Sequence, residues 1–323
     1  MSWFKNLLNF KDRYANPFEM AADGIMGMNQ RNVNYIGRYN KRSLYPLVDN
    51  KLLTKKIALS HHVKTPTLIG SVENQHQIQN ILQILGDHTE FCIKPAHGSG
   101  GKGILVVKDF NKATGHYVKT SGQDINNHEL KRHLTNILAG LFSLGGKSDI
   151  ALIEDLIHFD NVFSGYSYDG VPDTRVIVFQ GFPVMCMMRL STQASDGKAN
   201  LHQGAVGVGI CVRTGRAVRA VQHNMPIEFH LKVPHWDEVL ELAASCYDMS
   251  GLGYIGTDIV LDRDKGPMLL ELNARPGMAI QICNNAGLLP RLRLIEALTK
   301  KQRLSVKERV AFSKQHFGVF VED

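Results

Sequence analysis

The stretch FCIKPAHGSGGKGILVV, residues 91–107, places glycines in the spacing G-x-G-x-x-G between two apolar segments. Gly98, Gly100 and Gly103 form that spacing, and Lys102 lies inside it. Because glycine has no Cβ, the backbone N–H groups of such a loop can approach phosphate oxygens closely. The pattern predicts a phosphate-binding loop if other residues complete a nucleotide site, and a mobile turn if they do not.

The context of this loop excludes two common nucleotide-binding motifs. A Walker A loop requires G-x-x-x-x-G-K-[ST], but Ala96 stands five positions before Gly101, and Gly103 follows Lys102. A dinucleotide-binding fingerprint opens a helix, whereas the ILVV that follows Gly103 predicts a strand. What remains is a strand, a glycine-rich loop and a strand, which form a flap able to close over phosphates.

The composition is that of a folded globular protein. The 323 residues are 44% hydrophobic and 21% charged, enough for one large domain or two moderate ones. The net charge of +7 is spread along the chain, which favours anionic small ligands modestly and predicts no nucleic-acid-binding tail. The five cysteines are odd in number and have no C-x-x-C spacing, which argues against a disulfide framework or a zinc site and fits a reducing cytoplasm.

The sequence predicts no membrane span. No apolar run approaches the roughly 20 residues of a spanning helix. The start, MSWFKNLLNF, lacks the long apolar core and cleavage site of a signal peptide. We therefore expect a cytoplasmic location. Some residues near the start could form the apolar face of a short helix that docks on the protein's own core or lies on a membrane surface: Trp3, Phe4, Leu7, Leu8 and Phe10.

Helices and strands are expected in clusters. The predicted helices cover about residues 51–61, 75–85, 127–143, 236–249 and 290–300, with no helix after the last of these. The predicted strands cover about residues 90–95, 103–108, 151–157, 174–180, 182–188, 204–212, 254–262 and 266–274. A hairpin at Gly181 joins two of these strands. Because helices and strands do not alternate regularly, the predicted fold class is α+β.

Oxygen-bearing side chains on two neighbouring strands suggest a metal site. Glu271 and Asn273 are two positions apart on one predicted strand, so their side chains point to the same face. Asp258 lies on the strand before it. Such a set suits Mg²⁺, which keeps some of its waters and binds nucleotide phosphates. In the alternative interpretation, Asp258 and Asn273 cap strand ends and an arginine pairs with Glu271, since carboxylates in apolar strands are costly unless compensated.

Two lysines complete the pattern. Lys94 lies in the run FCIKP, where a strand should be half buried, so a phosphate would be a suitable partner. Lys51 follows Asp49 and Asn50 at the start of a predicted helix. Each lysine taken alone would be interpreted as a solvated surface residue.

Taken together, residues 49–277 resemble the ATP-grasp superfamily, with its motifs in family order. Within that superfamily the chain resembles the glutamate ligases that modify ribosomal protein, and more closely the alpha-L-glutamate ligase-like proteins. The stretch MNQRNVNYIGRYNKRSLYPLVDNKLLTK, residues 28–55, is similar to the latter group. The resemblance implies two α+β lobes that grip ATP: an N-lobe with the flap over residues 49–155 and a C-lobe with a magnesium site over residues 156–323. A short, mainly helical segment, residues 1–48, replaces the usual N-terminal domain.

The resemblance also implies roles for particular residues. Glu154 would lie near the exocyclic amine of adenine, and Asp173 at the ribose. The complete nucleotide-binding set is Lys51, Lys94, His97, Gly98, Ser99, Gly100, Gly101, Lys102, Gly103, Glu154, Asp155, Leu156, Asp173, Lys198 and Asn200. The implied ligands of Mg²⁺ or Mn²⁺ are Asp258, Glu271 and Asn273. The implied catalytic residues are Arg175, Arg189, Arg275 and Asn200.

The sequence departs from the glutamate ligases in one motif, residues 198–205, and at Arg275, which stands where those enzymes have serine. KANLHQGA, residues 198–205, is similar to their S-N-L-H-R-G-G, but Gln203 takes the place of the arginine. Arg275 or Arg189 could supply the missing positive charge. His202 is expected to be structural or to line the substrate pocket.

The resemblance implies ATP-dependent ligation of a carboxylate to an amine through an acylphosphate. Glutamate or a glutamyl peptide is a candidate substrate, and an amino acid or peptide a candidate amine acceptor. Two alternatives stay open: a phosphotransferase that stops at the phosphorylated substrate, and a catalytically weak ATP-binding sensor or assembly protein, which the glutamine at position 203 suggests. An oligomer is compatible with the sequence.

Overall fold

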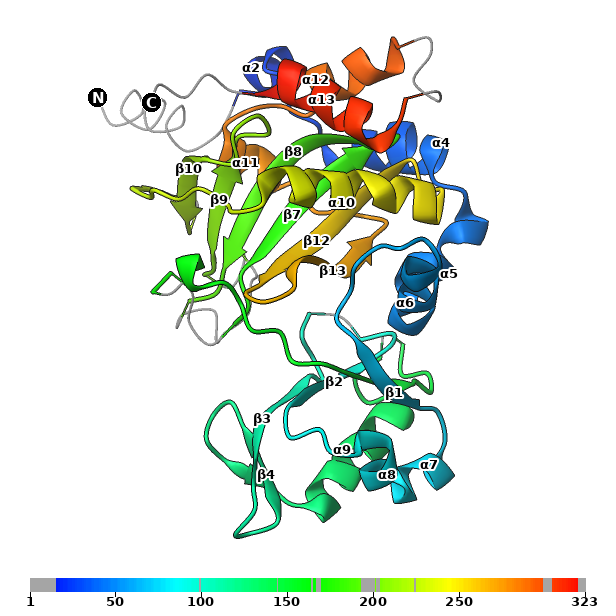
Figure 1. Cartoon of the computed structure of the whole chain (residues 1–323). Coiled ribbons are helices and arrows are strands. Elements are labelled where there is room, and N and C mark those ends of the chain that lie inside the picture. Colours follow the sequence, from blue (N-terminus) through cyan, green and yellow to red (C-terminus); the bar gives the residue numbers. More distant parts are fainter. Residues whose placement is uncertain are drawn as a thin grey trace, which may run out of the picture.

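The computed structural model describes residues 16–98, 100–143, 145–163, 165–166, 170–192, 201, 204–223, 225–298 and 304–318. The chain forms two lobes, each built on one antiparallel sheet (Figure 1). This arrangement confirms the predicted α+β class with two lobes.

The smaller lobe contains a sheet with the strand order β1-β6-β2-β3-β4-β5. Its strands are β1 (Leu68–Val72), β2 (Phe91–Pro95), β3 (Leu105–Asn111), β4 (His116–Lys119), β5 (Asp124–Ile125) and β6 (Ala151–Glu154). Its helices are α7 (Gln75–Gln79), α8 (Ile81–Leu85) and α9 (Asn127–Leu138). Apolar side chains of these helices, such as Leu130 and Leu134, share one core with Phe91, Ile93 and Val107 of the sheet. The flap connects β2 to β3, so this core supports both of its ends.

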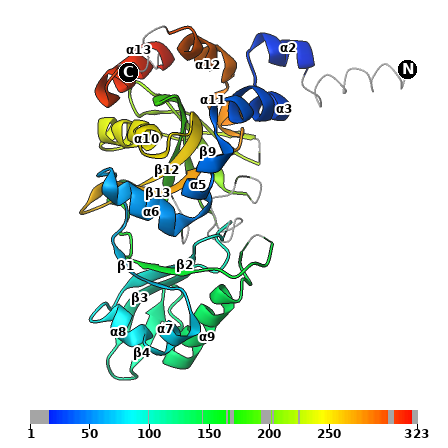
Figure 2. The same ribbon diagram turned by 90° about the vertical axis from the view of Figure 1, so that its right-hand side faces the viewer.

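The larger lobe contains a sheet with the strand order β11-β10-β9-β8-β7-β12-β13. Its strands are β7 (Asp173–Phe179), β8 (Phe182–Leu190), β9 (Val206–Ile210), β10 (Ala217–Gln222), β11 (Met225–Ile227), β12 (Tyr254–Asp262) and β13 (Gly266–Asn273). Its helices are the 3₁₀ turn η3 (Asn161–Phe163), α10 (Trp236–Ser250), α11 (Ile280–Asn284), α12 (Leu289–Glu296) and α13 (Val306–Phe317). Helix α10 covers one face of this sheet and α11 lies on the other (Figure 2).

The N-terminal segment is helical and packs on the larger lobe. It comprises α2 (Pro17–Ala22), α3 (Met28–Gln30), the π-helix η1 (Arg31–Ile36), α4 (Gly37–Tyr39), the 3₁₀ turn η2 (Arg42–Leu44) and α5 (Pro46–Asp49), and α6 (Lys51–Ser60) follows. The rings of Tyr35 and Tyr39 meet Phe179 edge-on, with centroids 5.6 and 4.9 Å away. Ala58 of α6 belongs to the same larger core. The domain boundaries given above stay a prediction, and this packing associates α6 with the larger lobe.

Several predicted elements are confirmed with small changes at their ends. The hairpin between β7 and β8 turns at Gln180 and Gly181, whose φ angles of 49° and 84° are both positive, as a type I′ turn requires. The predicted strand over residues 151–157 ends at Glu154. The predicted helix over residues 75–85 is two helices, because Asn80 ends α7 before α8 begins.

Two predictions about helices were wrong: the end of the helix that begins at residue 127, and the absence of a helix after residue 300. Helix α9 ends at Leu138 rather than near residue 143, because Gly140 has a φ of 80° and its backbone lies against Lys147. Helix α12 is followed by another helix, α13, that the sequence analysis missed. Ser305 and Glu308 form a capping box at its start, and their S-x-x-E spacing is the signal that would have predicted it.

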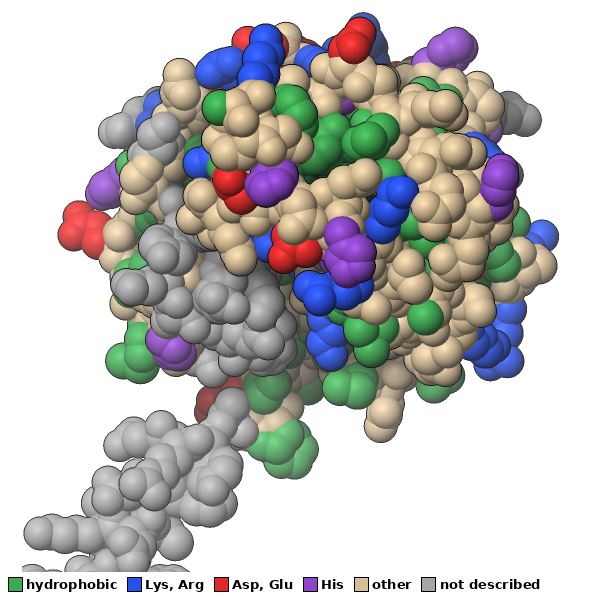
Figure 3. Space-filling model, turned by 90° about the horizontal axis from the view of Figure 1, so that it is seen from below, with side chains coloured by type: hydrophobic (Ala, Val, Ile, Leu, Met, Phe, Trp, Pro, Cys, Tyr) green, Lys and Arg blue, Asp and Glu red, His purple; other side chains and the backbone are tan. Residues whose placement is uncertain are grey.

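The remaining general predictions concern cysteines, membranes and charge. All five cysteines are free thiols, four of them buried. None of the described helices combines the length and the apolar character needed to cross a membrane. Seen from below, acidic, basic and histidine side chains are interspersed on the smaller lobe (Figure 3). The apolar residues at positions 3–10 lie outside the described residues.

Candidate active site

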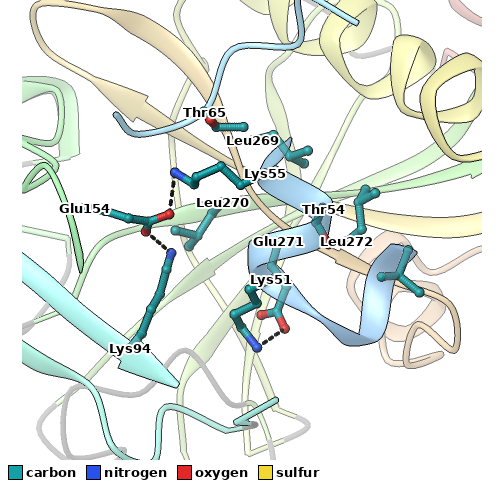
Figure 4. A pocket seen from close by; sticks show the side chains of 11 residues that line it. Lys51, Thr54, Lys55, Thr65, Lys94, Glu154, Leu269, Leu270, Glu271 and Leu272 are labelled. Atoms are coloured by element: carbon teal, nitrogen blue, oxygen red, sulfur yellow. Dashed lines mark ion pairs between the residues drawn. The ribbon is translucent and has the colours of Figure 1, made fainter. Parts of the chain in front are cut away.

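Five charged side chains meet in a pocket at the junction of the lobes (Figure 4). They come from α6, from β2 and β6 of the smaller sheet, and from β13 of the larger sheet. The residues that line the pocket are Val48, Lys51, Thr54, Lys55, Thr65, Lys94, Glu154, Leu269, Leu270, Glu271 and Leu272. The pocket therefore joins the two lobes through ionisable groups.

Glu154 is buried between two lysines. One carboxylate oxygen contacts Nζ of Lys55 and the other contacts Nζ of Lys94 (Figure 4). Lys55 also donates a hydrogen bond to the carbonyl of Pro66. The three charged residues are exposed by only 2 to 7%. Burial alone would raise the pKa of Glu154, but Lys94 and Lys55 hold that pKa below its usual value. Glu154 is therefore an ionised carboxylate at neutral pH.

Lys51 links the larger sheet to the flap. Its Nζ lies 3.3 Å from Oε1 of Glu271 and donates a 2.7 Å hydrogen bond to the carbonyl of Gly98. The side chain of Asn50 caps α6 and fixes where the helix begins. Because Lys51 and Lys55 are four positions apart on this helix, both reach the pocket.

The pocket carries surplus positive charge. Three lysines line it against two glutamates. A buried charge without a counter-charge is costly, so an anion is the partner that this set of residues favours.

The flap is anchored at both ends. Both the backbone N–H and Nδ1 of His97 meet the buried carboxylate of Asp149, with Nδ1 2.8 Å from Oδ1. Gly98 forms a bridge with Ser143. At the other end, a Cβ added to Gly103 would lie 2.5 Å from the ring of Phe142. The ends of the flap therefore have defined positions.

The tip of the flap is open. Gly100 and Gly101 have φ angles of 64° and 74°, which favour glycine, and a Cβ added at either would meet nothing within 4 Å. Lys102 is exposed beside them. Ser99 lies outside the described residues. The backbone at the tip is thus accessible to a ligand, as a phosphate-binding flap requires.

A second charged cluster lies within the larger sheet. Asp258 on β12 stands between Arg175 on β7 and Glu271 on β13 in the strand register. Arg175 forms a bidentate pair with Asp258, with N–O distances of 2.6 and 2.5 Å. Arg189 donates to Asp258 at 2.7 Å and holds Asp173 at 2.7 and 2.5 Å. The structure therefore brings together four residues predicted for the site.

Asp258 stays ionised in this cluster. Burial disfavours the charged form, but the guanidinium groups of Arg175 and Arg189 outweigh it and hold the pKa at about 2. The structure places Asp173, predicted at the ribose, in contact with Arg189. The cluster contains two arginines and two aspartates, so its charges balance.

The predicted metal ligands lie on the neighbouring strands β12 and β13. Asp258 and Glu271 are direct cross-strand neighbours, and Asn273 lies two positions beyond Glu271. Both interpretations of these residues describe part of what is observed: Asn273 ends β13 and accepts from the N–H of Arg275 at 2.9 Å, whereas Asp258 lies within its strand. The cation paired with Glu271 is a lysine, not an arginine. Among the described residues, no group of three or more His, Cys, Asp or Glu forms a metal site, so this set depends on an amide.

Other predicted residues lie elsewhere. Asp155 and Leu156 line a second pocket, and Oδ2 of Asp155 accepts from Nζ of Lys265 at 2.8 Å. The guanidinium of Arg275 lies over the ring of Tyr45, 5.5 Å from its centroid. Some predicted or discussed residues lie outside the described part of the chain: Ser99, Lys198, Asn200, His202 and Gln203.

Two residues of the site were not predicted from the sequence: Lys55 and Asp149. The spacing of four between Lys51 and Lys55 at the start of a predicted helix was a signal for the first. Asp149 lies in a loop before β6, and nothing in its local sequence indicated that it would hold His97.

Comparison with known families identifies the class. Residues 30–297 match the family described as sugar-transfer associated ATP-grasp. This match covers more than half of the chain, so the protein belongs to this ATP-grasp family. The predicted superfamily is confirmed, and the glutamate ligase-like subgroup stays a prediction. Sequence comparison with curated proteins gave no match.

Solved structures of ATP-grasp ligases resemble the chain distantly. The ATP-grasp ligase PsnB in complex with a minimal precursor is 14% identical, with a TM-score of 0.45 over 82% of this chain and 63% of PsnB. The D-cycloserine synthetase DcsG is 14% identical, with a TM-score of 0.46 over 83% of this chain and 74% of DcsG. The D-alanyl-alanine synthetase A of Vibrio cholerae is 9% identical, with a TM-score of 0.47 over 85% and 67%. The chain thus spans less than two thirds of PsnB, and the family assignment rests on the sequence match.

Proposed function

We propose that this protein is an ATP-dependent ligase that joins a carboxylate to an amine through an acylphosphate. Membership of an ATP-grasp family supports nucleotide binding. The observation that carries the proposal is the lobe junction, where three lysines and two glutamates line one pocket beside a glycine-rich flap. Surplus positive charge below a flap with an accessible backbone suits a polyphosphate.

The residues present fit ATP and Mg²⁺. Lys51 and Lys94 would contact phosphates, the flap would cover them, and Asp258, Glu271 and Asn273 would hold Mg²⁺ or Mn²⁺. When bound, Mg-ATP supplies the phosphoryl group that activates the carboxylate, and the metal neutralises part of its charge.

The chain's own side chains would orient the reactants and exclude water. Arg175 and Arg189 hold the pKa of Asp258 low, so its carboxylate is charged, and its remaining lone pairs would contact the metal. Arg275, on the turn after Asn273, is an exposed cation suited to an anionic substrate group, and Arg189 and Arg175 fix the carboxylates behind it. Closure of the flap would protect an activated carboxylate from hydrolysis.

The substrates and location belong to the proposal as well. A carboxylic acid and an amine acceptor, either an amino acid or a peptide, are the partners that we propose, with a glutamyl compound as one candidate acid. Because the family is described as sugar-transfer associated, acidic sugars and amino sugars belong among the candidates to test. A cytoplasmic site of action stays a prediction.

Turnover assays test the proposal. Purified protein is incubated with ATP, MgCl₂ and mixtures of acids and amines, while new masses and the release of ADP or AMP are recorded. We expect ADP and a new amide only when both substrates are present. Glu271→Ala and Asn273→Ala should each reduce magnesium-dependent turnover by about a hundredfold or more, since a bound metal supplies several kcal/mol of charge stabilisation.

The control and the contrary results are specific. Glu228→Ala, which removes an exposed carboxylate just after β11, should leave turnover unchanged. Unchanged turnover in both site variants would show that the metal site is misplaced. A phosphorylated acid formed without amine would indicate a phosphotransferase, and ATP binding without any turnover would indicate a sensor or assembly protein.

A further inference from the structure

The N-terminal segment contacts three consecutive residues that follow Asn273. These are Ala274, Arg275 and Pro276, the turn that leaves β13 at the candidate site. Each of them contacts a different residue of the N-terminal segment between η1 and α5. A segment far away in the sequence therefore holds the turn that carries a candidate catalytic arginine.

Asn40 provides the central contact. Its side chain is 4% exposed. Its Nδ2 donates to the carbonyls of Tyr254 at 2.7 Å and Ala274 at 3.3 Å, and its Oδ1 accepts from the N–H of Tyr254 at 2.8 Å. Only a side-chain amide offers two donor hydrogens and an acceptor in this arrangement. Asn40 thus ties the start of β12 to the residue after β13.

Two further contacts join the N-terminal segment to the turn, one at Pro276 and one at Arg275. Nη1 of Arg31 donates a 2.8 Å hydrogen bond to the carbonyl of Pro276. The guanidinium of Arg275 lies over the ring of Tyr45 at 5.5 Å, within the range of a cation–π interaction. From below, a Cβ added to Gly256 on β12 would lie 2.7 Å from Pro276, so the turn rests directly on the sheet. The turn is held between the sheet and the N-terminal segment.

Arg275 keeps its charge available. It is exposed, and among the described residues no carboxylate lies within ion-pair distance of its guanidinium. An aromatic ring orients a guanidinium without neutralising it. The arrangement therefore orients a positive charge on the turn that follows the candidate metal ligand Asn273.

We propose that the N-terminal segment positions the 273–276 turn, with Asn40 as the fixed point and Tyr45 as the support of Arg275, and thereby sets the affinity for an anionic group of the substrate. This inference rests on the proposed function. It assigns a role to the helical segment that precedes α6, and it makes Asn40 and Tyr45 positioning residues rather than catalytic ones.

Substitutions at Tyr45 test the role in turnover. Tyr45→Ala should raise the KM for the anionic substrate about two- to fivefold, the range expected for loss of a cation–π contact at an exposed site, and leave the KM for ATP unchanged. Tyr45→Phe keeps the ring and should restore wild-type behaviour. In an Arg275→Ala background, Tyr45→Ala should add less than about a twofold effect, because the two residues act as one unit. Full additivity, or an equal rise in the KM for ATP, would overturn the proposal.

Amide hydrogen exchange tests the positioning without turnover. Asn40→Ala should accelerate exchange in peptides that cover residues 274–278, whereas Asn34→Ala, an exposed asparagine on the same segment, should not. If Asn40→Ala does not fold, Tyr45→Ala supplies the same measurement. Unchanged exchange in the folded variants would refute the positioning role of the N-terminal segment. If the variants show the expected exchange but the wild-type protein turns over no substrate, only the proposed ligase function is refuted.

Discussion

Two clusters of buried charges differ in how they are balanced. In the larger lobe, Asp258 and Asp173 share Arg175 and Arg189, so each carboxylate has an arginine and one arginine contacts both. At the lobe junction, Glu154 is the one carboxylate among the described residues in ion-pair contact with Lys55 and Lys94. The first cluster is neutral, and Asp258 in it has two arginine partners. The second cluster depends on a single carboxylate.

The difference in charge balance suggests that the larger-lobe cluster is a fixed frame and that the junction cluster is the site for an anion. Planar guanidinium groups hold carboxylates in bidentate geometry, which suits a fixed frame that positions Asp258, one of the candidate metal ligands. Lysines are point charges on flexible stems, and those at the junction exceed their partners in number. Such a cluster gains most from an anion that enters the pocket. We therefore expect its residues to be the more sensitive to substitution.

The largest effect on stability is expected for Glu154→Gln. Removal of this carboxylate leaves Lys55 and Lys94 buried without a counter-charge, which should lower the free energy of unfolding by about 3–5 kcal/mol. Urea unfolding at pH 7 measures it. The matched control is Glu90→Gln, which removes a half-exposed carboxylate paired with His158 and should cost much less. Equal costs for the two variants would show that the junction lysines do not depend on Glu154.

A smaller effect is expected for Arg175→Met. Asp258 loses its bidentate partner but keeps Arg189 at 2.7 Å, so the cost should be about 2 kcal/mol and below that of Glu154→Gln. The same unfolding experiment measures it, with Arg263→Met as control, because Arg263 is exposed and pairs with exposed Asp264. A cost for Arg175→Met that exceeds the cost for Glu154→Gln would reverse the proposed order of the two clusters.

The smallest effect is the part of the Glu154 contribution that depends on pH. Burial opposes ionisation, but Lys94 and Lys55 lower the folded-state pKa of Glu154 below its value of about 4.3 in the unfolded chain. A lowered folded-state pKa contributes stability above the unfolded pKa, and this stability is lost as pH falls through the folded pKa. The difference in unfolding free energy between wild type and Glu154→Gln should therefore shrink below about pH 4. A constant difference from pH 6 to pH 3 would contradict the lowered pKa.

The sequence alone determined the class of the fold and most of its strands. Alternating apolar runs and turn residues mark β12, β13 and the β7–β8 hairpin, because strand periodicity and positive-φ turns are local properties. The same periodicity correctly put Glu271 and Asn273 on one face. Local signals were less reliable at helix ends, where Gly140 and the capping box at Ser305 were overlooked.

Only the tertiary structure decided which charged groups meet. Glu154 pairs with Lys55 and Lys94, and Asp258 with Arg175 and Arg189, across separations that no local pattern encodes. Packing brings these groups together because neither sheet can bury a charge without a partner from another strand or helix. The contacts of Asn40 and Tyr45 with the turn after Asn273 have the same origin: strand patterns predict where β13 ends, whereas the fold determines which distant segment holds that end in place.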